Sequence, residues 1–533
     1  MDRQEADLIL SGAKVYTLDA TGTTATGVAV AGGRILAVGS DAEMDTYAAP
    51  GARRMSLPGA TVLPGLIDSH FHVTHVGHAL GMAYLYDTWS IAEIVERLKR
   101  QAAKAPGPVL GRGGNFHETS LAEGRLPTAA DLDQVATDRL VMITDVNKTI
   151  VNSFALRHID AEDVPPGGEV PRDSSGKPLG IFLYAAKAMT PFGLFGAPAG
   201  VPSISTEDAI VRGLEDAARF GLTGVLDAMG DRETIPAFRA LARSGRLPIR
   251  VSTMPHLPSI ELRDLDTMGI FFGLQEGRLA FGPIKLIFDL MVMHKTALLY
   301  EPYVGQPGNC GKSSVSPEEL RREIDESFAA GWPVGIHTTG DRGIDITAAA
   351  IERGIEKAGK APARCHLIHV YFPTEKALAI AERHALPIAA QPPFIRTWGE
   401  TVRASVGPER ASRFTPLRTL LDRGLAVGGG ADSSITWHDP WLGIYAAVTR
   451  KTEGGRVLGE AEQITVAEAL RCYTLGSAAV LEQEKVRGSI EPGKLADFTV
   501  IDRDILSVDV AQIPGTRVLQ TIVGGETAYQ AGE

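Results

Sequence analysis

Short apolar segments alternate with amphipathic segments along most of the chain. Each apolar segment ends near glycine or polar residues, as buried strands of a parallel sheet do. The segments between them have the apolar spacing of helices and open near Ser, Thr, Asp or Pro. The predicted strands are 60–67, 223–227, 249–254, 284–288, 334–337, 365–369, 387–391 and 425–432, and the predicted helices include 206–220, 317–330, 344–357 and 374–383. This series predicts an α/β protein built on a (β/α)8 TIM barrel, whose functional side chains stand at the carboxyl ends of the strands.

Both ends of the chain are rich in short strands and turns. The first 60 residues hold short apolar segments broken by Ser-Gly and Gly-Gly pairs, which are typical of hairpins. Residues 496–501 and 518–523 have the same character. We therefore predict one discontinuous domain from residues 1–60 and 486–533, around a barrel domain of residues 61–485. Two unrelated caps would give the same pattern.

The first two central strands are separated by more chain than one crossover helix requires. Residues from about 80 to 200 are therefore interpreted as an insertion. It contains a predicted helix over 91–104, a strand over 139–144 and a Gly/Pro-rich run at 165–168. Because binding residues are often carried by loops on a rigid scaffold, we predict that this insertion lines the active site and selects the substrate.

The charge and the cysteine content narrow the classes of partner. The 533 residues carry a formal net charge of −11, which argues against a general nucleic-acid or anionic-membrane surface. Three cysteines lie far apart, so neither a disulfide framework nor a zinc knuckle is indicated. The acidic N-terminal residues and the short apolar stretch after them do not match a signal peptide or a spanning helix. We expect a soluble cytoplasmic protein with a small-molecule substrate and no nucleic-acid or membrane partner; a homodimer is one option for its oligomeric state.

A His-x-His pair follows the first predicted strand. Successive side chains of a strand point to opposite faces, so His70 and His72 project from the same side, about 7 Å apart along the chain, and can share a metal. The pair alone is weak evidence, because such spacings occur by chance. It gains weight from its position directly after the apolar run 60–67.

Other strand ends carry further polar groups that suit a metal. They are Lys285 on the fourth strand, His337 on the fifth, His369 on the sixth and Asp432 on the eighth. Imidazole and carboxylate together favour zinc or a similar divalent ion. We therefore predict a metal site at this end of the barrel. The alternative is that these side chains are ordinary surface or core residues.

These motifs resemble the amidohydrolase superfamily. The matching segments are Leu-Pro-Gly-Leu-Ile-Asp-Ser-His-Phe-His at 63–72, His-Thr-Thr-Gly-Asp-Arg-Gly-Ile-Asp at 337–345 and Gly-Ala-Asp-Ser at 430–433. Within the superfamily the chain is similar to the YtcJ-like branch, which includes N-substituted formamide deformylases. The similarity extends over nearly the whole chain, through 285–289 and 488–497. The resemblance implies a distorted TIM barrel, a β-sandwich made from both termini and a hydrolytic site with one or two metals.

Carried over by position, the resemblance also assigns metal ligands. His70 and His72 would bind the more buried metal, and His337 and His369 the more exposed one. Lys285 matches a lysine that bridges two metals after carbamylation, which turns a repulsive ammonium into a carboxylate-like ligand. The alternative is an unmodified lysine beside a single metal.

The resemblance places Asp432 opposite the metal-bound water. A metal lowers the pKa of its water from about 16 toward 7, which gives a hydroxide nucleophile at neutral pH. The expected reaction is hydrolysis of an amide-type C–N bond in an N-acyl, N-formyl or related small molecule, with Asp432 as general acid and base. Asp432 could instead serve only as a metal ligand. The other classes are a non-hydrolytic metal enzyme, such as a decarboxylase or hydratase, and a catalytically silent binding protein.

Some positions depart from the pattern of the branch. The branch commonly reads Asp-Gly-His where this chain has Asp-Val-Asn at 145–147, Asp-Gly where it has Asp-Leu at 289–290, and Glu where it has Ile368. The metal set is intact, but the altered positions leave formamide specificity open. The candidates for substrate contacts, each of which could equally be structural, are Arg112, His117, Asn147, His294, Arg396 and Trp398.

Overall fold

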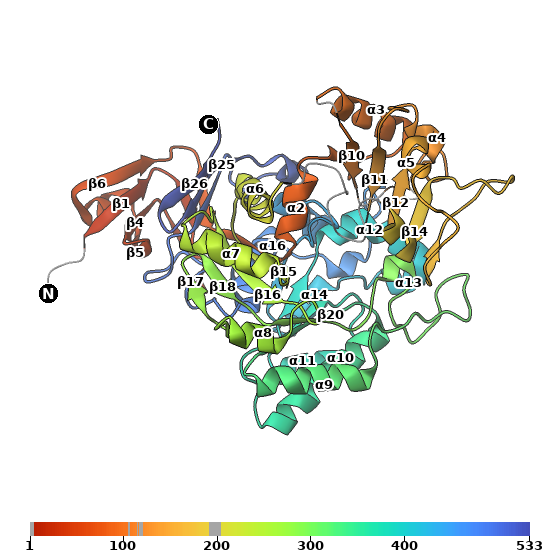
Figure 1. Ribbon diagram of the computed structural model, residues 1–533. Coiled ribbons are helices and arrows are strands. Elements are labelled where there is room, and N and C mark those ends of the chain that lie inside the picture. The colour runs from red at the N-terminus through yellow and green to blue at the C-terminus, as the bar shows by residue number, and fades with distance from the viewer. Residues whose placement is uncertain are drawn as a thin grey trace. The chain divides into compact units, whose positions relative to one another are not determined.

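The structure is a computed structural model that describes residues 5–104, 107–113, 116, 121–145, 147–190 and 204–532. It divides into two compact units (Figure 1). The first unit holds Met1–His72, Leu214–Asp432 and His438–Glu533, and the second unit holds Val73–Gly213 and Ser433–Trp437. The second unit is therefore mostly one continuous stretch of chain, which begins directly after His72.

Two five-stranded sheets form the centre of the first unit. One has the order β17 (Gln275–Glu276), β18 (Leu279–Phe281), β16 (Arg250–Pro255), β15 (Leu222–Gly230) and β8 (Leu66–Phe71). The other has the order β19 (Ile284–Ile287), β20 (Val334–Thr338), β21 (His366–His369), β22 (Ile388–Ala390) and β23 (Val427–Gly429). All neighbours are parallel except β17 and β18. The predicted α/β architecture is confirmed at this level, with mixed sheets.

The first predicted strand is divided at Gly65. Its first part is β7 (Thr61–Pro64), which joins a sheet of the chain ends, and its second part is β8. A Cβ atom at position 65 would lie 2.2 Å from Oγ1 of Thr223, so only glycine fits where the chain passes this close to β15. β8 extends beyond the predicted strand, so His70 lies within a strand and His72 just after it.

The hydrogen-bond ladders of the described residues do not form the closed eight-stranded TIM barrel that the sequence predicts. Backbone donors change neighbours at the start of the fourth predicted strand, between Gly282 and Ile284. The N–H of Gly282 bonds to the carbonyl of Thr253 (2.8 Å), and that of Ile284 bonds to the carbonyl of Pro333 (2.9 Å). Pro283 between them has no N–H to donate. As a result β18 pairs with β16, whereas β19 pairs with β20.

A second interruption lies between β8 and β23. Here the carboxylate of Asp68 accepts the N–H groups of His70 (2.8 Å) and Ala431 (3.0 Å). The N–H of Asp432 bonds to the carbonyl of His70 (2.8 Å). Hydrogen bonds to the Asp68 side chain and one backbone hydrogen bond therefore replace a regular ladder between β8 and β23. We call this junction, formed by Asp68, His70, Ala431 and Asp432, the β8–β23 seam.

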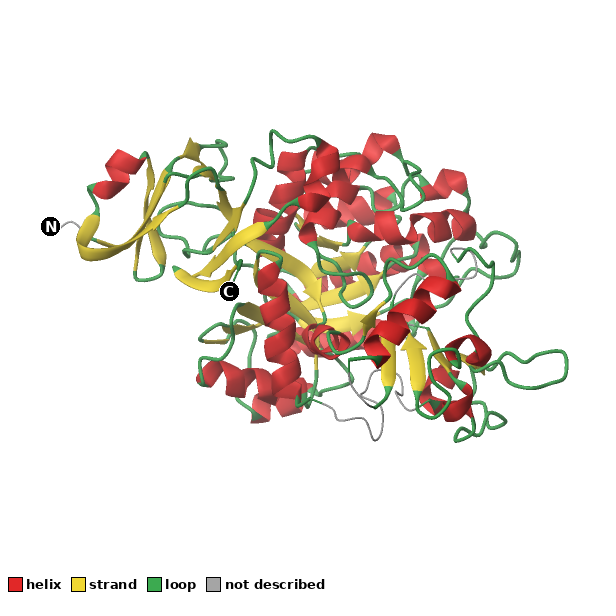
Figure 2. Cartoon of the chain, turned by 90° about the horizontal axis from the view of Figure 1, so that it is seen from above, coloured by secondary structure: helices red, strands yellow, loops and turns green. Residues whose placement is uncertain are grey.

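Helices cover the strands of the first unit, as the red and yellow ribbons of Figure 2 show. α9 (Pro317–Ala329) begins at Ser316, whose Oγ accepts the N–H of Glu319 (3.1 Å), and has a proline in its first turn. α9 and α11 pack on α10 (Figure 1). The other α-helices of this unit are α1 (Asp41–Asp45), α7 (Thr234–Arg243), α8 (Leu262–Thr267), α10 (Asp341–Ala358), α11 (Glu375–Arg383), α12 (Pro393–Val406), α13 (Pro408–Ala411), α14 (Leu417–Asp422), α15 (Pro440–Thr449), α16 (Val466–Arg471) and α17 (Ser477–Val480), while α6 (Thr206–Arg219) belongs to both units.

Strands from both chain ends pair in one sheet of the first unit. Its order is β26 (Glu526–Gln530), β25 (Val518–Val523), β24 (Phe498–Ile501), β7, β2 (Lys14–Tyr16) and β3 (Thr24–Ala25). A second sheet has the order β5 (Arg34–Gly39), β4 (Gly27–Ala31), β1 (Ala6–Ser11) and β6 (Ala48–Ser56). Leu10 and Val30 of the second sheet share a hydrophobic core with Val62, Phe498 and Ile522 of the first. The two sheets therefore pack on one another.

The second unit contains a six-stranded mixed sheet. Its order is β13 (Gly168–Glu169), β14 (Ile181–Tyr184), β12 (Lys148–Val151), β11 (Val141–Thr144), β10 (Val109–Arg112) and β9 (Ala83–Tyr84). α3 (Ile91–Ala102) places Ile94 and Leu98 in one core with Val109 and Val141. The shorter helices are α2 (Val73–Ala79), α4 (Ala129–Leu132), α5 (Ser153–Leu156) and the 3-10 helix η1 (Ala185–Met189). No helix in the described part of the chain is long and apolar enough to cross a membrane.

Candidate metal centre

His70 of β8 and His72, just after this strand, meet Asp432 at the carboxyl ends of the central strands. The Oδ1 atom of Asp432 lies 3.0 Å from Nε2 of His72 and 3.6 Å from Nε2 of His70. These three residues each offer one ligand atom, and the three atoms all lie within 4.8 Å of one another. The spacing suits a single divalent ion held by two imidazoles and a carboxylate.

The backbone fixes these ligands in place. Asp68 accepts hydrogen bonds from the backbone on both sides of the β8–β23 seam, so one buried carboxylate holds the positions of His70 and Asp432 together. Asp432 itself has a φ of +51°, in the left-handed region that non-glycine residues rarely adopt. His369 has a φ of +75°. Backbone in this region is strained, and such residues concentrate at functional sites.

Lys285 lies beside the same cluster. Its side chain is 2% exposed, and its Nζ is 3.5 Å from Nε2 of His70. Burial lowers the pKa of Lys285 to about 7, although the negative charge of Asp432 opposes the change. A substantial fraction of the amine is therefore neutral at neutral pH and has a free lone pair.

His337 and His369 form a second pair. Nδ1 of His337 lies 2.8 Å from Nε2 of His369, and the rings of His369 and His70 are 5.2 Å apart. On their outer sides, Nδ1 of His369 lies 2.5 Å from Oε1 of Gln391, and Nε2 of His337 lies 3.3 Å from the carbonyl of Leu290. Both outer partners are acceptors, so each ring can donate its outer N–H to them.

This arrangement tests whether a metal fits the site. Burial, followed by the charge of His369, holds the pKa of His337 well below its usual range, and burial lowers that of His369 to about 4. Each ring is therefore neutral and has one N–H. When both outer bonds are made, the two inner nitrogens turn lone pairs toward each other at 2.8 Å. Two facing lone pairs repel unless a cation lies with them, so the donor set fits a metal ion.

The protonation states of His70 and Asp432 also favour metal binding. Burial, with smaller effects of Lys285 and His369, holds the pKa of His70 well below its ordinary value. Burial alone would raise the pKa of Asp432, but the hydrogen bond with His72 and the electrostatic effect of the neighbouring side chains lower it overall. A neutral imidazole and an ionised carboxylate are the forms that bind metals.

Gln391 and His256 belong to this centre, although sequence reasoning did not single them out. Gln391 is fully buried, and its Nε2 donates to the carbonyl of Ala389 (2.9 Å), which turns its Oε1 toward His369. His256 follows β16, with Nδ1 2.7 Å from Oγ of Ser259. Burial, then the charge of Lys285, lowers the pKa of His256 to about 4. Both residues stand at or just after predicted strands, so a survey of every strand end would have found them.

The predicted substrate contacts lie in both units. His294 and Trp398 pack together in the first unit, with their rings 5.9 Å apart, and Arg396 has its Nε 3.9 Å from Oε1 of Glu453. Arg112 ends β10 in the second unit. In the same unit Asn147 accepts the N–H of Tyr184 at its carbonyl (2.7 Å). His117 lies outside the described residues.

Neutral imidazoles and a carboxylate at the carboxyl ends of parallel strands are the ligand arrangement of metal-dependent α/β enzymes. The chain belongs to the amidohydrolase family, whose sequence model matches residues 55–529. The resemblance seen in the sequence is thereby confirmed.

Known relatives match the chain over almost its full length. The Bacillus subtilis protein YtcJ, named as an amidohydrolase, is 29% identical over 98% of this chain and 99% of its own. The N-substituted formamide deformylase of Arthrobacter pascens is 29% identical over 99% of each chain. A crystal structure described as an uncharacterized metal-dependent hydrolase from Pyrococcus horikoshii OT3 has a TM-score of 0.76 at 25% identity, covering 95% of this chain and 99% of that one. These relatives support a hydrolase.

Proposed function

We propose that the protein is a metal-dependent hydrolase that cleaves an amide-type C–N bond of a small N-acyl or N-formyl compound. The observation that carries this proposal is the pair of inner nitrogens of His337 and His369, which face each other at 2.8 Å while both rings are bonded on their outer sides. Two lone pairs that face each other suit a cation. The name of the formamide deformylase relative supports the choice of bond.

The ligands divide between two positions in this proposal. His70, His72 and Asp432 hold one divalent ion, for which we favour zinc, and His337 and His369 hold a second. When bound, such an ion lowers the pKa of a coordinated water and polarises a carbonyl oxygen. Gln391 keeps the ring of His369 oriented by accepting its outer N–H, as partners of metal-ligating histidines do.

Asp432 moves the proton in the proposed reaction. Its carboxylate is ionised and 6% exposed, so it is available as a base that bulk water does not fully solvate. It takes a proton from the attacking water and returns it to the departing amine, which makes the amine a better leaving group. Nε2 of His72 lies 3.0 Å from Oδ1, so the two atoms face the same position.

Lys285 supplies the bridge between the two positions. Its pKa of about 7 leaves amine available to react with carbon dioxide. The nitrogen attacks the carbon atom, one proton is released, and a carbamate of charge −1 results. The carbamate would offer its oxygens to the site as anionic ligands. An unmodified lysine beside a single metal is the alternative, and a metal count per chain separates the two.

The proposal also covers the detailed architecture of the protein and its location in the cell. We infer that the two central sheets correspond to a distorted (β/α)8 barrel, interrupted at Pro283 and at the β8–β23 seam, with a β-sandwich from both ends of the chain and a segment of about 80–200 that lines the active site. We also infer a cytoplasmic enzyme that acts on small molecules. The interruptions explain how a barrel can be present without a continuous ladder.

The experiment that tests the function combines metal analysis with a substrate screen. Purified protein is expected to hold one to two divalent ions per chain and to release an amine and a carboxylic acid from at least one N-formyl or N-acyl amine. Full activity after exhaustive chelation, with no metal detected, would refute the proposal. Release of carbon dioxide, or addition of water without cleavage, would instead identify a decarboxylase or a hydratase.

A further inference from the structure

A cavity of about 280 Å³ lies within the first unit, and none of the proposed metal ligands lines it. Its walls come from the segments that follow β19, β20 and β21 and from the region of α12 and α13. We call it the Asp341 cavity, after the residue at the start of α10 that lines it. The volume lies near the lower end of the range for small-molecule sites, so the cavity suits a ligand smaller than a typical drug.

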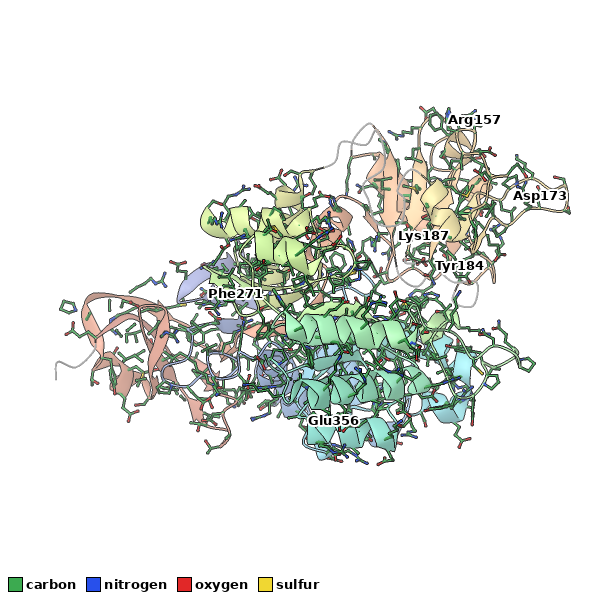
Figure 3. All side chains as sticks on the ribbon, turned by 60° about the horizontal axis from the view of Figure 1, so that its bottom comes forward. Arg157, Asp173, Tyr184, Lys187, Phe271 and Glu356 are labelled. Atoms are coloured by element: carbon green, nitrogen blue, oxygen red, sulfur yellow. The ribbon has the colours of Figure 1, made fainter. Side chains whose placement is uncertain are left out.

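Asp341 brings a carboxylate with an unused oxygen to this cavity. It begins α10, near whose end lies Glu356, labelled in Figure 3. Its Oδ1 accepts the N–H groups of Tyr300 (2.9 Å) and Arg342 (2.7 Å), whereas Oδ2 accepts no hydrogen bond from a described residue. Burial raises the pKa of Asp341, although the two hydrogen bonds and the charge of Arg410 oppose the change. A cationic group at Oδ2 would therefore stabilise the ionised carboxylate.

Arg413 brings a guanidinium with spare donors to the same cavity. It follows α13 and is exposed. Its side chain donates one long hydrogen bond, from Nη2 to the carbonyl of Pro373 (3.4 Å), and forms no ion pair with a described residue. Its other donors are available to a carboxylate, which a guanidinium can bind through two N–H groups at once.

Arg410 is a second cation at the cavity, and backbone carbonyls hold it in place. Its Nε donates to the carbonyl of Val406 (2.7 Å), Nη2 to that of Pro302 (2.8 Å) and Nη1 to that of Glu301 (3.2 Å). The carboxylate that pairs with it is that of Glu301, at 3.9 Å and 76% exposed. Exposed pairs at this distance contribute little, so the charge of Arg410 is only weakly neutralised.

The cavity thus carries charges of both signs that do not pair with each other. Among the described residues, neither Arg410 nor Arg413 forms an ion pair with Asp341. Glu375, the other carboxylate at the cavity, pairs with Arg423. A ligand with one cationic and one anionic group could pair with both sides, whereas a ligand with a single charge could pair with only one.

Apolar side chains form the rest of the wall. Leu299, Pro373 and Val406 are buried, and Phe372 is half-buried with its ring 5.9 Å from that of Phe414. Such a surface gains free energy when an aliphatic group covers it. The ligand should therefore combine two opposite charges with a small apolar group.

We propose that the Asp341 cavity binds a free α-amino acid of about the size of leucine. The ammonium group of the ligand pairs with Oδ2 of Asp341. Its carboxylate accepts N–H groups of Arg413, next to the charge of Arg410, and its side chain packs on Leu299 and Phe372. The inference goes beyond the proposed hydrolase function, because binding at this cavity requires no turnover.

Direct binding tests the class of ligand. Metal-loaded full-length protein is titrated by calorimetry with L-leucine and with three compounds that each lack one of its features. These are 4-methylpentanoate, without the amine, 3-methylbutylamine, without the carboxylate, and glycine, without the side chain. Leucine should bind, and each of the others should bind roughly tenfold more weakly or worse, because one charge-assisted or apolar contact is lost.

Two substitutions locate the binding. Arg413→Gln removes the cation at an exposed position, so the thermal midpoint should stay unchanged while leucine binds roughly tenfold more weakly. Asp341→Asn keeps an acceptor at Oδ1 and should weaken leucine by a similar factor. The matched controls are Arg263→Gln and Asp266→Asn at exposed positions of α8, which does not line the cavity, and both should leave the affinity unchanged.

The possible outcomes separate this inference from the proposed function. The inference is overturned if wild-type protein does not bind leucine, if it binds 4-methylpentanoate equally well, or if neither substitution weakens leucine. The last result would be expected if leucine bound a metal ion instead. Leucine binding by a protein that hydrolyses no amide would contradict the hydrolase function alone, and an active hydrolase that does not bind leucine would contradict this inference alone.

Discussion

Asp432 is the residue on which the proposed chemistry depends most directly. Asp432→Asn keeps the shape of the side chain but removes its basicity. Turnover should fall by about 100-fold or more, because general acid-base help is lost. The metal content should change less, because His70 and His72 remain as ligands. The measurement is kcat together with metal per chain, and Asp266→Asn at an exposed site is the matched control. Near-normal turnover would assign the proton transfer to another group.

Lys285 gives a second prediction at this scale. Lys285→Ala should lose one of two metals and most activity, because the bridging carbamate cannot form. Added acetate or bicarbonate should restore part of both by supplying a carboxylate in the vacated space. Metal analysis of wild type and variant, with and without acetate, checks this. A wild-type protein with one metal and an unmodified amine would contradict the bridge while leaving a one-metal hydrolase.

Gln391 is predicted to orient the ring of His369 and to take no direct part in the reaction. Gln391→Met has a similar volume but cannot accept the outer N–H of His369. Metal affinity, measured by competition with a chelator, should fall by roughly 10- to 100-fold. Gln391→Glu keeps an acceptor and should retain more of the affinity. Gln512→Met, at an exposed position, serves as control, and equal affinities in all the variants would remove Gln391 from the centre.

At the scale of elements, Asp289 ties β19 to the turn that follows β20. Its buried carboxylate accepts the N–H groups of Thr339 (2.8 Å), Gly340 (3.0 Å) and Leu298 (3.0 Å). Asp289→Asn puts an NH2 group where one oxygen accepts, so a buried donor faces a donor. The free energy of unfolding should fall by roughly 2–3 kcal/mol. Urea denaturation compared with Asp266→Asn measures this, and equal midpoints would show that the turn tolerates the change.

The strands of the structure also show which parts of the fold could be predicted from the sequence. Apolar runs predicted the central strands, and polar residues at their ends predicted the side chains that the structure brings together as His70, His72, Lys285 and Asp432. The change of neighbours at Pro283 was not predicted, because one residue without an N–H does not alter the apolar pattern. The sheet of the second unit was mostly missed, since several of its strands have two to four residues.

Two buried lysines of the second unit show a different limit of prediction from the sequence. Lys148 and Lys187 are 39 positions apart, and both contact Asp145 because β12 pairs with β14, which η1 follows. Hydrophobic spacing identifies a strand but not its partner. Gln391 was missed for a chemical reason, because a side-chain amide is not among the usual ligands of zinc and its predicted role is through His369.

At the scale of the whole molecule, the proposed ligands come from both central sheets. His70 and His72 stand on the sheet that contains β8, whereas Lys285, His337 and His369 stand on the sheet of β19 to β23. A bound ion would join the two sheets. Removing it should therefore lower the thermal midpoint, since a ligand at 100 times its dissociation constant adds about 2.7 kcal/mol of stability. Equal melting curves before and after chelation would contradict this.

The two central sheets are interrupted at Pro283 and at the β8–β23 seam. The connection that a bound ion would make between these sheets therefore has a biological consequence. Where ladders are discontinuous, sheets can open locally, and open forms are the substrates of proteases. We expect metal-free chains to exchange their amide hydrogens faster at both interruptions and to be degraded sooner. The amount of this protein in a cell would then follow the supply of its metal, so that scarcity removes the enzyme as well as its activity.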